Sequence, residues 1–304
     1  MALKIGLLSV LGLLWALRLA AIKAAGVAGI PVHVVVSVSA LGIAVFFTGV
    51  AVWRRDWPSI DRTTLSFFVL SGFFGFLAPF ALESIVAPHL PVFVFVVIIS
   101  TMPIITLLLS ITIGNERLGA APVIAIALGF LGAMTILWDT TQTDHEGEFT
   151  AVGIWWVMIA FGVPSLYALN TVFVATRWPG TTSAIHVAHA QAMIVSVAAI
   201  VGSAFAGAIG DWTLVARDPL AIGLIVAAEG LALLVYLRIT RDYGATWVSF
   251  ANYVAMIFAA IVGAAVFDDR ITWLTVAAAL VIVASVVLYQ RRPATTRTEG
   301  AGDV

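Results

Sequence analysis

Residues 90–138 read LPVFVFVVIISTMPIITLLLSITIGNERLGAAPVIAIALGFLGAMTILW. The stretch consists of two apolar runs joined by a short polar elbow at 115–119. Pro103 interrupts the first run, and Gly129 and Gly132 punctuate the second. Each run has close to the roughly 20 apolar residues that a helix needs to cross a bilayer. The stretch therefore predicts two membrane-spanning helices joined by a tight turn.

The same pattern returns near the end of the chain. An apolar run from Ala245 meets an elbow at 268–272 and continues as a last apolar run to Tyr289. In the second elbow Asp269–Ile271 takes the place of Glu116–Leu118 in the first. A pattern that repeats at a fixed offset is typical of duplicated membrane units. The chain is therefore predicted to contain two copies of one such unit.

The composition also indicates a membrane protein. Hydrophobic residues make up 62% of the 304 residues, charged residues make up 10%, and the mean hydropathy is +1.10. A soluble domain has about 25% charged residues. The net charge of −1 argues against a nucleic-acid-binding surface, which needs a basic patch. The absence of Cys excludes disulfides, thiolate nucleophiles and thiolate metal sites.

Ten apolar runs can be marked along the chain. They lie near 4–24, 32–53, 65–87, 90–113, 119–138, 151–174, 183–208, 219–239, 244–267 and 272–290. The predicted fold class is an all-α polytopic membrane protein with ten transmembrane helices, arranged as two inverted five-helix repeats. The predicted units are a first repeat at 1–138, a linker at 139–150, a second repeat at 151–290 and a cytoplasmic tail at 291–304.

The distribution of Lys and Arg predicts the orientation. Lys23, Arg217 and Arg270 fall on one side of the membrane, and Arg18 lies within the first run. The other eleven fall on the opposite side: Lys4, Arg54, Arg55, Arg62, Arg117, Arg177, Arg238, Arg241, Arg291, Arg292 and Arg297. Both termini are therefore predicted to be cytoplasmic, in a multi-pass protein of the inner (plasma) membrane. Because five spans is an odd number, the second copy enters the membrane inverted, as in many secondary transporters.

Glu229 is the polar residue predicted to lie deepest in the membrane. It follows Pro219 by ten residues, which places it ~15 Å into the bilayer at a rise of ~1.5 Å per residue. Tyr236 shares its helix face at i+7. A carboxyl at this depth can bind and release a proton or pair with a cationic group of a substrate. The alternative is a structural carboxyl that stays protonated or is hydrogen-bonded to a neighbouring helix.

Two further charges fall inside apolar runs. Arg18 lies in the first run and Glu83 in the third, and the same rise places both in the outer third of the bilayer. A charge in hydrocarbon costs at least ~2.5 kcal/mol, so the two are predicted to pair. The pair would act either as an outer gate or as a static clasp that makes both charges tolerable.

Small polar and aromatic side chains predict where a cavity would lie. Ser249 and Asn252 share one face of the ninth run, and Ser100 and Thr101 lie at a comparable depth in the fourth. Trp15 lies inside the first run, away from the interface that suits its ring. These residues are predicted to line a cavity, with helix packing as the alternative.

His186 and His189 stand at i and i+3 on the seventh run. A metal site has to be considered for such a pair, but no Asp or Glu shares this helix face and the chain has no Cys. No metal site is therefore predicted. The two histidines are expected to line a wet vestibule at the cytoplasmic end or to pack on another helix.

The fifth run carries a face of small residues: Ala125, Gly129, Gly132 and Ala133. Such faces let membrane helices approach closely. This face could therefore pack against another helix of the chain or against a second copy in a homodimer.

Several of these features together resemble the drug/metabolite transporter superfamily, and specifically its EamA-like branch. The resemblance covers about residues 5–290 and rests on Trp15 and Lys23 in the first helix, Pro103 in the fourth, the Glu116–Leu118 elbow, Gly129 and Gly132 in the fifth, and the repeated elbow Asp269–Ile271. The chain departs from the family pattern at Met256, where Pro is usual, and at the elbow acid Asp269. Arg18 and Glu229 also occupy positions that the family usually fills with uncharged or small residues.

The resemblance implies a ten-helix inverted repeat. It also implies a substrate cavity formed largely by helices 1, 3, 4, 6, 8 and 9, with helices 5 and 10 peripheral. The implied activity is secondary transport or export of small metabolites such as amino acids or drug-like compounds.

The function predicted from the sequence is therefore a secondary active transporter that exports small metabolites by alternating access and is coupled to protons. The chain has no Walker-type nucleotide motif, no H-E-x-x-H and no G-x-S-x-G, so no cofactor, metal or catalytic residue is predicted. The partners expected are a small-molecule substrate and the lipid bilayer. A channel-like permease and an intramembrane enzyme are the alternatives.

Overall fold

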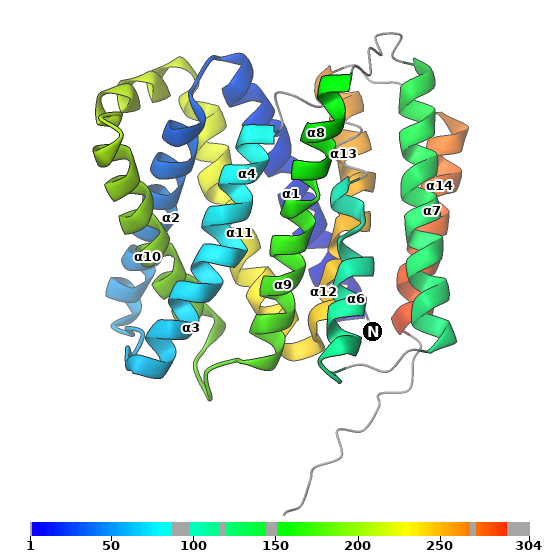
Figure 1. Ribbon diagram of the computed structural model, residues 1–304, viewed down its shortest axis with the longest axis horizontal. Coiled ribbons are helices and arrows are strands. Elements are labelled where there is room, and N and C mark those ends of the chain that lie inside the picture. Colours follow the sequence, from blue (N-terminus) through cyan, green and yellow to red (C-terminus); the bar gives the residue numbers. More distant parts are fainter. Residues whose placement is uncertain (1, 87–97, 116–118, 144–150, 268–271, 291–304) are drawn as a thin grey trace, which may run out of the picture.

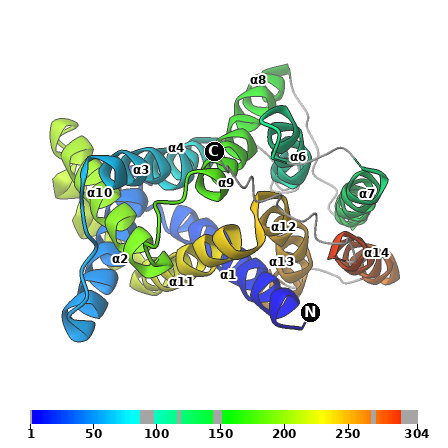
Figure 2. The ribbon, with the colours of Figure 1, turned by 90° about the horizontal axis from the view of Figure 1, so that it is seen from below.

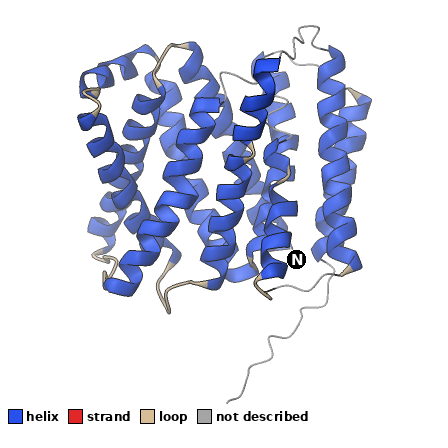
Figure 3. Ribbon diagram, in the orientation of Figure 1, coloured by secondary structure: helices blue, strands red, loops and turns tan. Residues whose placement is uncertain are grey.

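The computed structural model describes residues 2–86, 98–115, 119–143, 151–267 and 272–290. In these ranges all the regular secondary structure is helical (Figure 3). The helices stand side by side with their long axes roughly aligned (Figure 1). This is the arrangement expected in a bilayer, where a helix satisfies its backbone hydrogen bonds internally.

The main helical segments among the described residues of the first half run in the following order. They are α1 (Ala2–Val27), α2 (Val32–Arg54), α3 (Arg62–Gly72) continued through the π-helical turn η1 (Phe73–Leu77) into α4 (Ala78–Val86), α6 (Met102–Thr112) and α7 (Ala120–Thr143). The second half contains α8 (Ala151–Ala160), α9 (Gly162–Thr176), α10 (Ala184–Phe205), the 3-10 helix η3 (Ile209–Arg217), α11 (Pro219–Tyr243), α12 (Ala245–Ser249), α13 (Ala251–Phe267) and α14 (Trp273–Gln290).

Among the described residues, seven segments are long and apolar enough to cross a membrane. They are Leu3–Gly26, Val32–Arg54, Arg62–Val86, Met158–Thr176, Ala184–Phe205, Pro219–Tyr243 and Ala245–Val262. Three shorter apolar helices cover Ile98–Thr112, Ala120–Thr135 and Val276–Tyr289. The prediction of a multi-pass helical membrane protein is thus confirmed, while the count of ten spans stays a prediction.

Two of the predicted spans are broken beside a proline. The helix at 98–100 ends in a turn at Thr101 before α6, and α8 ends in a turn at Phe161 before α9. Pro103 and Pro164 lie in the first turn of the helix that follows. Proline lacks an amide hydrogen and clashes with the preceding turn, so it suits a helix start. The elbows Glu116–Leu118 and Asp268–Ile271 lie outside the described residues.

The start of α3 is fixed by a capping box. The Asp61 side chain accepts a hydrogen bond from the Thr64 backbone N–H, and the Asp61 N–H donates to the Thr64 hydroxyl. The hydrogen bonds from the Thr64 backbone and then from its side chain lower the pKa of Asp61. The box therefore ends the preceding loop and starts the span that carries Glu83.

The helices contact one another in a regular pattern. α1 packs against α11 and α13, and α9 packs against α6 and α4. α2 pairs with α10, and α7 pairs with α14. Seen from below, the α2 and α10 pair lies at one end of the molecule and the α7 and α14 pair at the other (Figure 2). The elements between these pairs enclose the site described below.

The small-residue face of α7 is used within the chain. A Cβ atom added to Gly132 would lie 2.7 Å from Ile282 Cγ1 and 3.0 Å from the Ala278 carbonyl oxygen, both on α14. A Cβ atom added to Gly129 would overlap the ring of Tyr253 on α13 and lie 3.0 Å from Ser285 Oγ. The face therefore meets other helices of the same chain, which removes the sequence argument for a homodimer through it.

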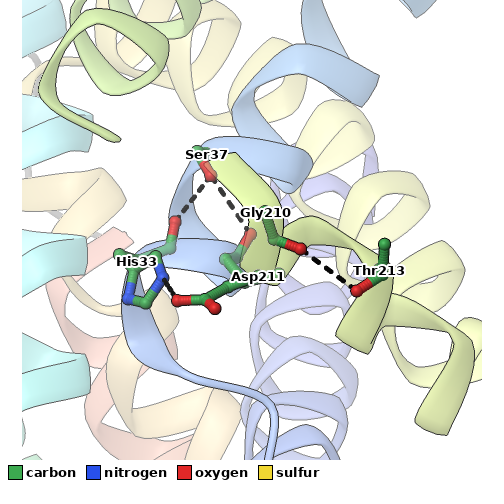
Figure 4. Close-up of polar contacts among 6 residues, drawn as sticks. His33, Ser37, Gly210, Asp211 and Thr213 are labelled. Atoms are coloured by element: carbon green, nitrogen blue, oxygen red, sulfur yellow. Dashed lines mark hydrogen bonds and ion pairs between the residues drawn. The ribbon is translucent and has the colours of Figure 1, made fainter. Parts of the chain in front are cut away.

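The segment between α10 and α11 is tied to the start of α2 (Figure 4). His33 Nε2 lies 3.0 Å from Asp211 Oδ2 in η3, and Arg217 Nη1 donates to the Gly29 carbonyl oxygen over 2.7 Å. The seventh run was predicted to reach residue 208, but α10 ends at Phe205 and η3 follows. The polar Asp211 and Thr213 suit a helix that lies across one end of the bundle.

We expect Gly129→Ala to lower the thermal unfolding temperature of the purified protein. The added methyl group collides with the Tyr253 ring, which has no exposed surface, and overpacking of this kind costs ~1–3 kcal/mol. Gly223→Ala on α11 is the matched control, because nothing lies within 4 Å of its added Cβ. An unfolding temperature for Gly129→Ala equal to that of the control would show that α7 does not pack as described.

Candidate charge cluster and cavity

One guanidinium pairs with two carboxylates in the middle of the bundle. Arg18 Nη2 on α1 donates to Glu83 Oε2 on α4 over 2.9 Å. Arg18 Nε lies 2.8 Å from Glu229 Oε2 on α11. Arg18 is 4% exposed, Glu83 4% and Glu229 9%. The three side chains, called the charge cluster below, therefore join three separate helices inside an apolar surrounding.

The two carboxylates of the charge cluster are held differently. Glu83 accepts hydrogen bonds from Arg18 and from the Tyr167 hydroxyl, the second over 3.3 Å. Glu229 is close to Arg18, but the two groups are not aligned for a hydrogen bond. The Arg18 guanidinium carbon also lies 4.6 Å from the centre of the Phe80 ring, a favourable cation–π distance. We therefore expect Glu83 to be the anchored partner of Arg18 and Glu229 to be the partner more easily exchanged.

A cavity of about 60 Å³ opens beside the charge cluster. At about 10–15 Å³ per water molecule it has room for a few waters. Arg18, Glu83 and Tyr167 form its polar wall. The remaining lining is mainly apolar: Trp15, Leu19, Ile99, Ser100, Met102, Asn252, Ala255, Met256 and Ala259. The cavity therefore presents both a cation and a carboxylate to a small ligand within an apolar chamber.

The predicted lining residues fall into two groups. Trp15 and Asn252 line the cavity. Ser249 is fully buried and donates to the Thr246 carbonyl oxygen, while the Thr101 hydroxyl donates to the Ile98 carbonyl oxygen over 2.6 Å. Ser249 and Thr101 are not among the residues that line this cavity, and their predicted role in binding a substrate stays a prediction.

Tyr236 lies next to the cavity, not in its wall. Its ring centre is 6.4 Å from that of Trp15, and its hydroxyl bonds Asn170 and Thr171 on α9, each over 2.9 Å. The side chain is 8% exposed. Tyr236 thus packs against Trp15, which itself lines the cavity.

The predicted depths of the charges require a correction. Glu229 was placed at mid-bilayer and Arg18 and Glu83 in the outer third, yet the structure brings all three within ion-pair distance. α11 runs from Pro219 to Tyr243, so Glu229 is two residues from its middle, which is ~3 Å along the axis. Arg18 thus lies within ion-pair distance of both Glu83 and Glu229, which brings the three charged groups together.

The two histidines have protein partners away from the cavity. His186 Nε2 lies 2.9 Å from Asp56 Oδ1, and His189 Nε2 lies 3.1 Å from the Thr48 hydroxyl on α2. His189 thus packs on α2, His186 contacts Asp56 in the loop after α2, and neither belongs to the cavity wall described above. No three His, Asp or Glu side chains in the described ranges gather in a group that could hold a metal ion.

The contribution of α9 to the site was not predicted from the sequence. Tyr167, Asn170 and Thr171 stand at i, i+3 and i+4, so they share one helix face. Tyr167 contacts Glu83, and the other two bond Tyr236. This spacing of three polar residues inside an apolar run was the signal that could have revealed them.

Comparison with known proteins identifies the first half of the chain. Residues 3–138 match the model of the EamA-like transporter family. This segment is therefore similar to the EamA-like transporter family. The family is part of the drug/metabolite transporter superfamily, so the resemblance predicted from the sequence is confirmed over this range. The EamA-like segment supplies Arg18 and Glu83 of the charge cluster.

Solved structures share the fold of the whole chain. One crystal structure has a TM-score of 0.72 to this chain at 12% sequence identity, covering 95% of this chain and 96% of its own. In all, 28 chains of known structure match. At this identity the likeness concerns the fold alone, which extends from the EamA-like segment through the second half. No curated protein matches the chain.

We expect Glu83→Gln to destabilise the protein more than Glu229→Gln. Glu83 holds two hydrogen bonds and its loss leaves a buried guanidinium poorly paired, whereas Glu229 holds Arg18 only by proximity. Removing one partner of a buried pair costs up to ~3–5 kcal/mol. Thermal unfolding in the same detergent measures both variants, and a larger loss for Glu229→Gln would reverse the assignment of anchor and exchangeable partner.

Proposed function

We propose that the chain is a secondary active transporter that exports small metabolites, such as amino acids or drug-like compounds, by alternating access. The observation that carries the proposal is a cavity whose wall holds buried, paired charges inside an apolar bundle. Charged residues at membrane depth are costly and characteristically mark the path of a substrate or ion. The EamA-like match of residues 3–138 supports the same class of function.

The charge cluster supports coupling to protons. One guanidinium and two carboxylates leave one net negative charge when both carboxylates are ionised. An uncompensated charge in an apolar surrounding is unfavourable, so the cluster favours one bound proton or one cationic group. Glu229 is the carboxyl that takes the proton in this proposal, because Glu83 is held by two donors. Protonation of Glu229 then frees part of the Arg18 guanidinium for an anionic group of a substrate.

The contacts between helices support an inverted repeat of five plus five spans. α1 packs on α11 and α13, and its proposed counterpart α9 packs on α4 and α6. The pairs α2 with α10 and α7 with α14 each join proposed counterparts. Exchanging the two halves therefore preserves the main contacts. In this arrangement both termini face the cytoplasm and the chain resides in the inner (plasma) membrane.

Purified protein in proteoliposomes tests the class of function. A carrier exchanges labelled substrate with saturable kinetics, and a panel of amino acids and organic cations identifies the substrate. Conductance that rises in proportion to voltage would instead favour a channel-like permease. Chemical conversion of the compound without translocation would favour an enzyme.

We expect Glu229→Gln to abolish uptake driven by a pH gradient while retaining exchange at equal pH. A gradient of one pH unit supplies about 1.4 kcal/mol per proton, or about tenfold accumulation, only when a proton moves with each cycle. The matched control is Asp242→Asn at the far end of α11, where Asp242 contacts Arg241 and Arg238 away from the cavity. Gradient-driven accumulation by Glu229→Gln at the level of the control would contradict the proposed coupling role.

A further inference from the structure

A second polar layer lies beside the charge cluster and joins the same helices. The Tyr236 hydroxyl on α11 accepts a hydrogen bond from Asn170 Nδ2 on α9 and contacts Thr171 Oγ1, each over 2.9 Å. The Trp15 ring on α1 lies against Tyr236 and also lines the cavity. The hydrogen-bonded group of Tyr236, Asn170 and Thr171 is called the tyrosine lock below.

The direction of each hydrogen bond in the tyrosine lock follows from the donors available. The single hydroxyl proton of Thr171 is donated to the Tyr167 carbonyl oxygen over 2.6 Å. Tyr236 must therefore donate its own proton to Thr171 Oγ1 while it accepts from Asn170. The Tyr236 hydroxyl thus uses its donor and an acceptor to tie α11 to α9.

The tyrosine lock also reaches the span that carries Glu83. Asn170 lies against Gly75 in the π-helical turn η1, so closely that a Cβ atom at Gly75 would overlap the Asn170 side chain. Asn170 is 2% exposed, and its Oδ1 has no hydrogen-bond partner among the described residues. π-helical turns are rare in proteins, but those that occur are often found at functional sites. Asn170 therefore packs tightly against the span that carries Glu83, at a position where a side chain larger than glycine would not fit.

Each of four spans contributes to both layers. The span of α1 carries Arg18 and Trp15, the span of α3 and α4 carries Glu83 and Gly75, α9 carries Tyr167 and Asn170, and α11 carries Glu229 and Tyr236. The residue of the second layer comes before the residue of the charge-cluster layer in the sequence of α1 and of the span formed by α3 and α4. It comes after that residue in the sequence of α9 and of α11. The spans of α9 and α11 therefore run antiparallel to the spans of α1 and of α3 and α4. The second layer lies on the side of the charge cluster that faces the N-terminal end of α1.

We propose that the tyrosine lock is the gate that closes the transport pathway on the side of the α1 N-terminus, with Trp15 as the floor of the cavity above it. The role as a gate rests on the proposed transport function. Because rigid helices join the two layers, a change of partner at Glu229 moves α11 and strains the bond between Tyr236 and Asn170. Release of the tyrosine lock then opens the far side of the pathway.

The test measures water access beyond the tyrosine lock and needs no substrate. Thr240 is the reporter, because it lies one helix turn past Tyr236, is 1% exposed and bonds the Tyr236 carbonyl oxygen. The chain contains no Cys, so Thr240→Cys introduces the only thiol. The protein is reconstituted in nanodiscs, where both faces are accessible, and labelled with a charged methanethiosulfonate reagent. Adding Tyr236→Phe is expected to raise the labelling rate about tenfold, since it removes two buried hydrogen bonds.

The control is Tyr253→Phe in the same Thr240→Cys background. Tyr253 is also buried and loses one hydrogen bond, to the Ile126 carbonyl oxygen, but it lies outside both layers. Equal labelling rates for Tyr236→Phe and Tyr253→Phe would overturn the proposal.

Asn170→Ala provides a second route if Tyr236→Phe does not yield folded protein. It removes the donor to Tyr236 and relieves the contact with Gly75, so it is also expected to raise labelling of Thr240→Cys about tenfold. An unchanged rate in this variant likewise overturns the tyrosine lock. Failure of the wild-type protein to transport any compound would instead count against the proposed function, because the labelling comparison is independent of transport.

Discussion

The structure depends on one buried guanidinium shared between two carboxylates. Each of these charges alone would oppose insertion of its helix, because a lone charge in hydrocarbon is unfavourable. Arg18 joins Glu83 and Glu229 and thereby holds α1, α4 and α11 together. Arg18 and Glu83 also form part of the cavity wall, while Glu229, outside that wall, gives the cluster one more negative than positive charge when both carboxylates are ionised. Stability and, in the proposed function, the exchange of a proton or ligand therefore depend on the same three side chains.

The two carboxylates of the charge cluster differ in their contacts, so we expect one of them to leave Arg18 more easily than the other. Glu83 stays with Arg18 and Tyr167, whereas Glu229 contacts Arg18 without an aligned hydrogen bond. A proton or cation that takes Glu229 leaves Arg18 paired with Glu83, so no buried cation is left alone. Because Glu229 and Tyr236 stand two helix turns apart on α11, the exchange is linked to the layer beneath the cavity.

Much of this arrangement could be predicted from the sequence, because the bilayer restricts what a chain can do. Charges are rare in apolar runs, so Arg18 and Glu83 were natural partners, and Trp15 and Asn252 were expected at the cavity that they line. A contact that depends on how far a long side chain extends between helices could not be predicted from the positions of charges in apolar runs. The contact of Arg18 with Glu229 was missed because helix ends fix depth only to within a few residues.

Tertiary packing decided the remaining details. The π-helical turn at Phe73–Leu77 accommodates Asn170 from another helix, and nothing in the local sequence specifies that neighbour. Hydroxyl groups such as those of Ser249 and Thr101 can bond their own helix turn or face a cavity, and the sequence does not distinguish the two. For the small face of α7, only the folded chain reveals that α13 and α14 cover it.

The central claim is that Glu229 exchanges a proton inside the bundle. Infrared difference spectroscopy of the protein in lipid, recorded as the pH is varied, measures this directly through the carbonyl band of a protonated carboxyl group. The account predicts one such band that appears as the pH falls and that is missing in Glu229→Gln. A folded protein without a titrating band, or a band that persists unchanged in Glu229→Gln, would contradict it.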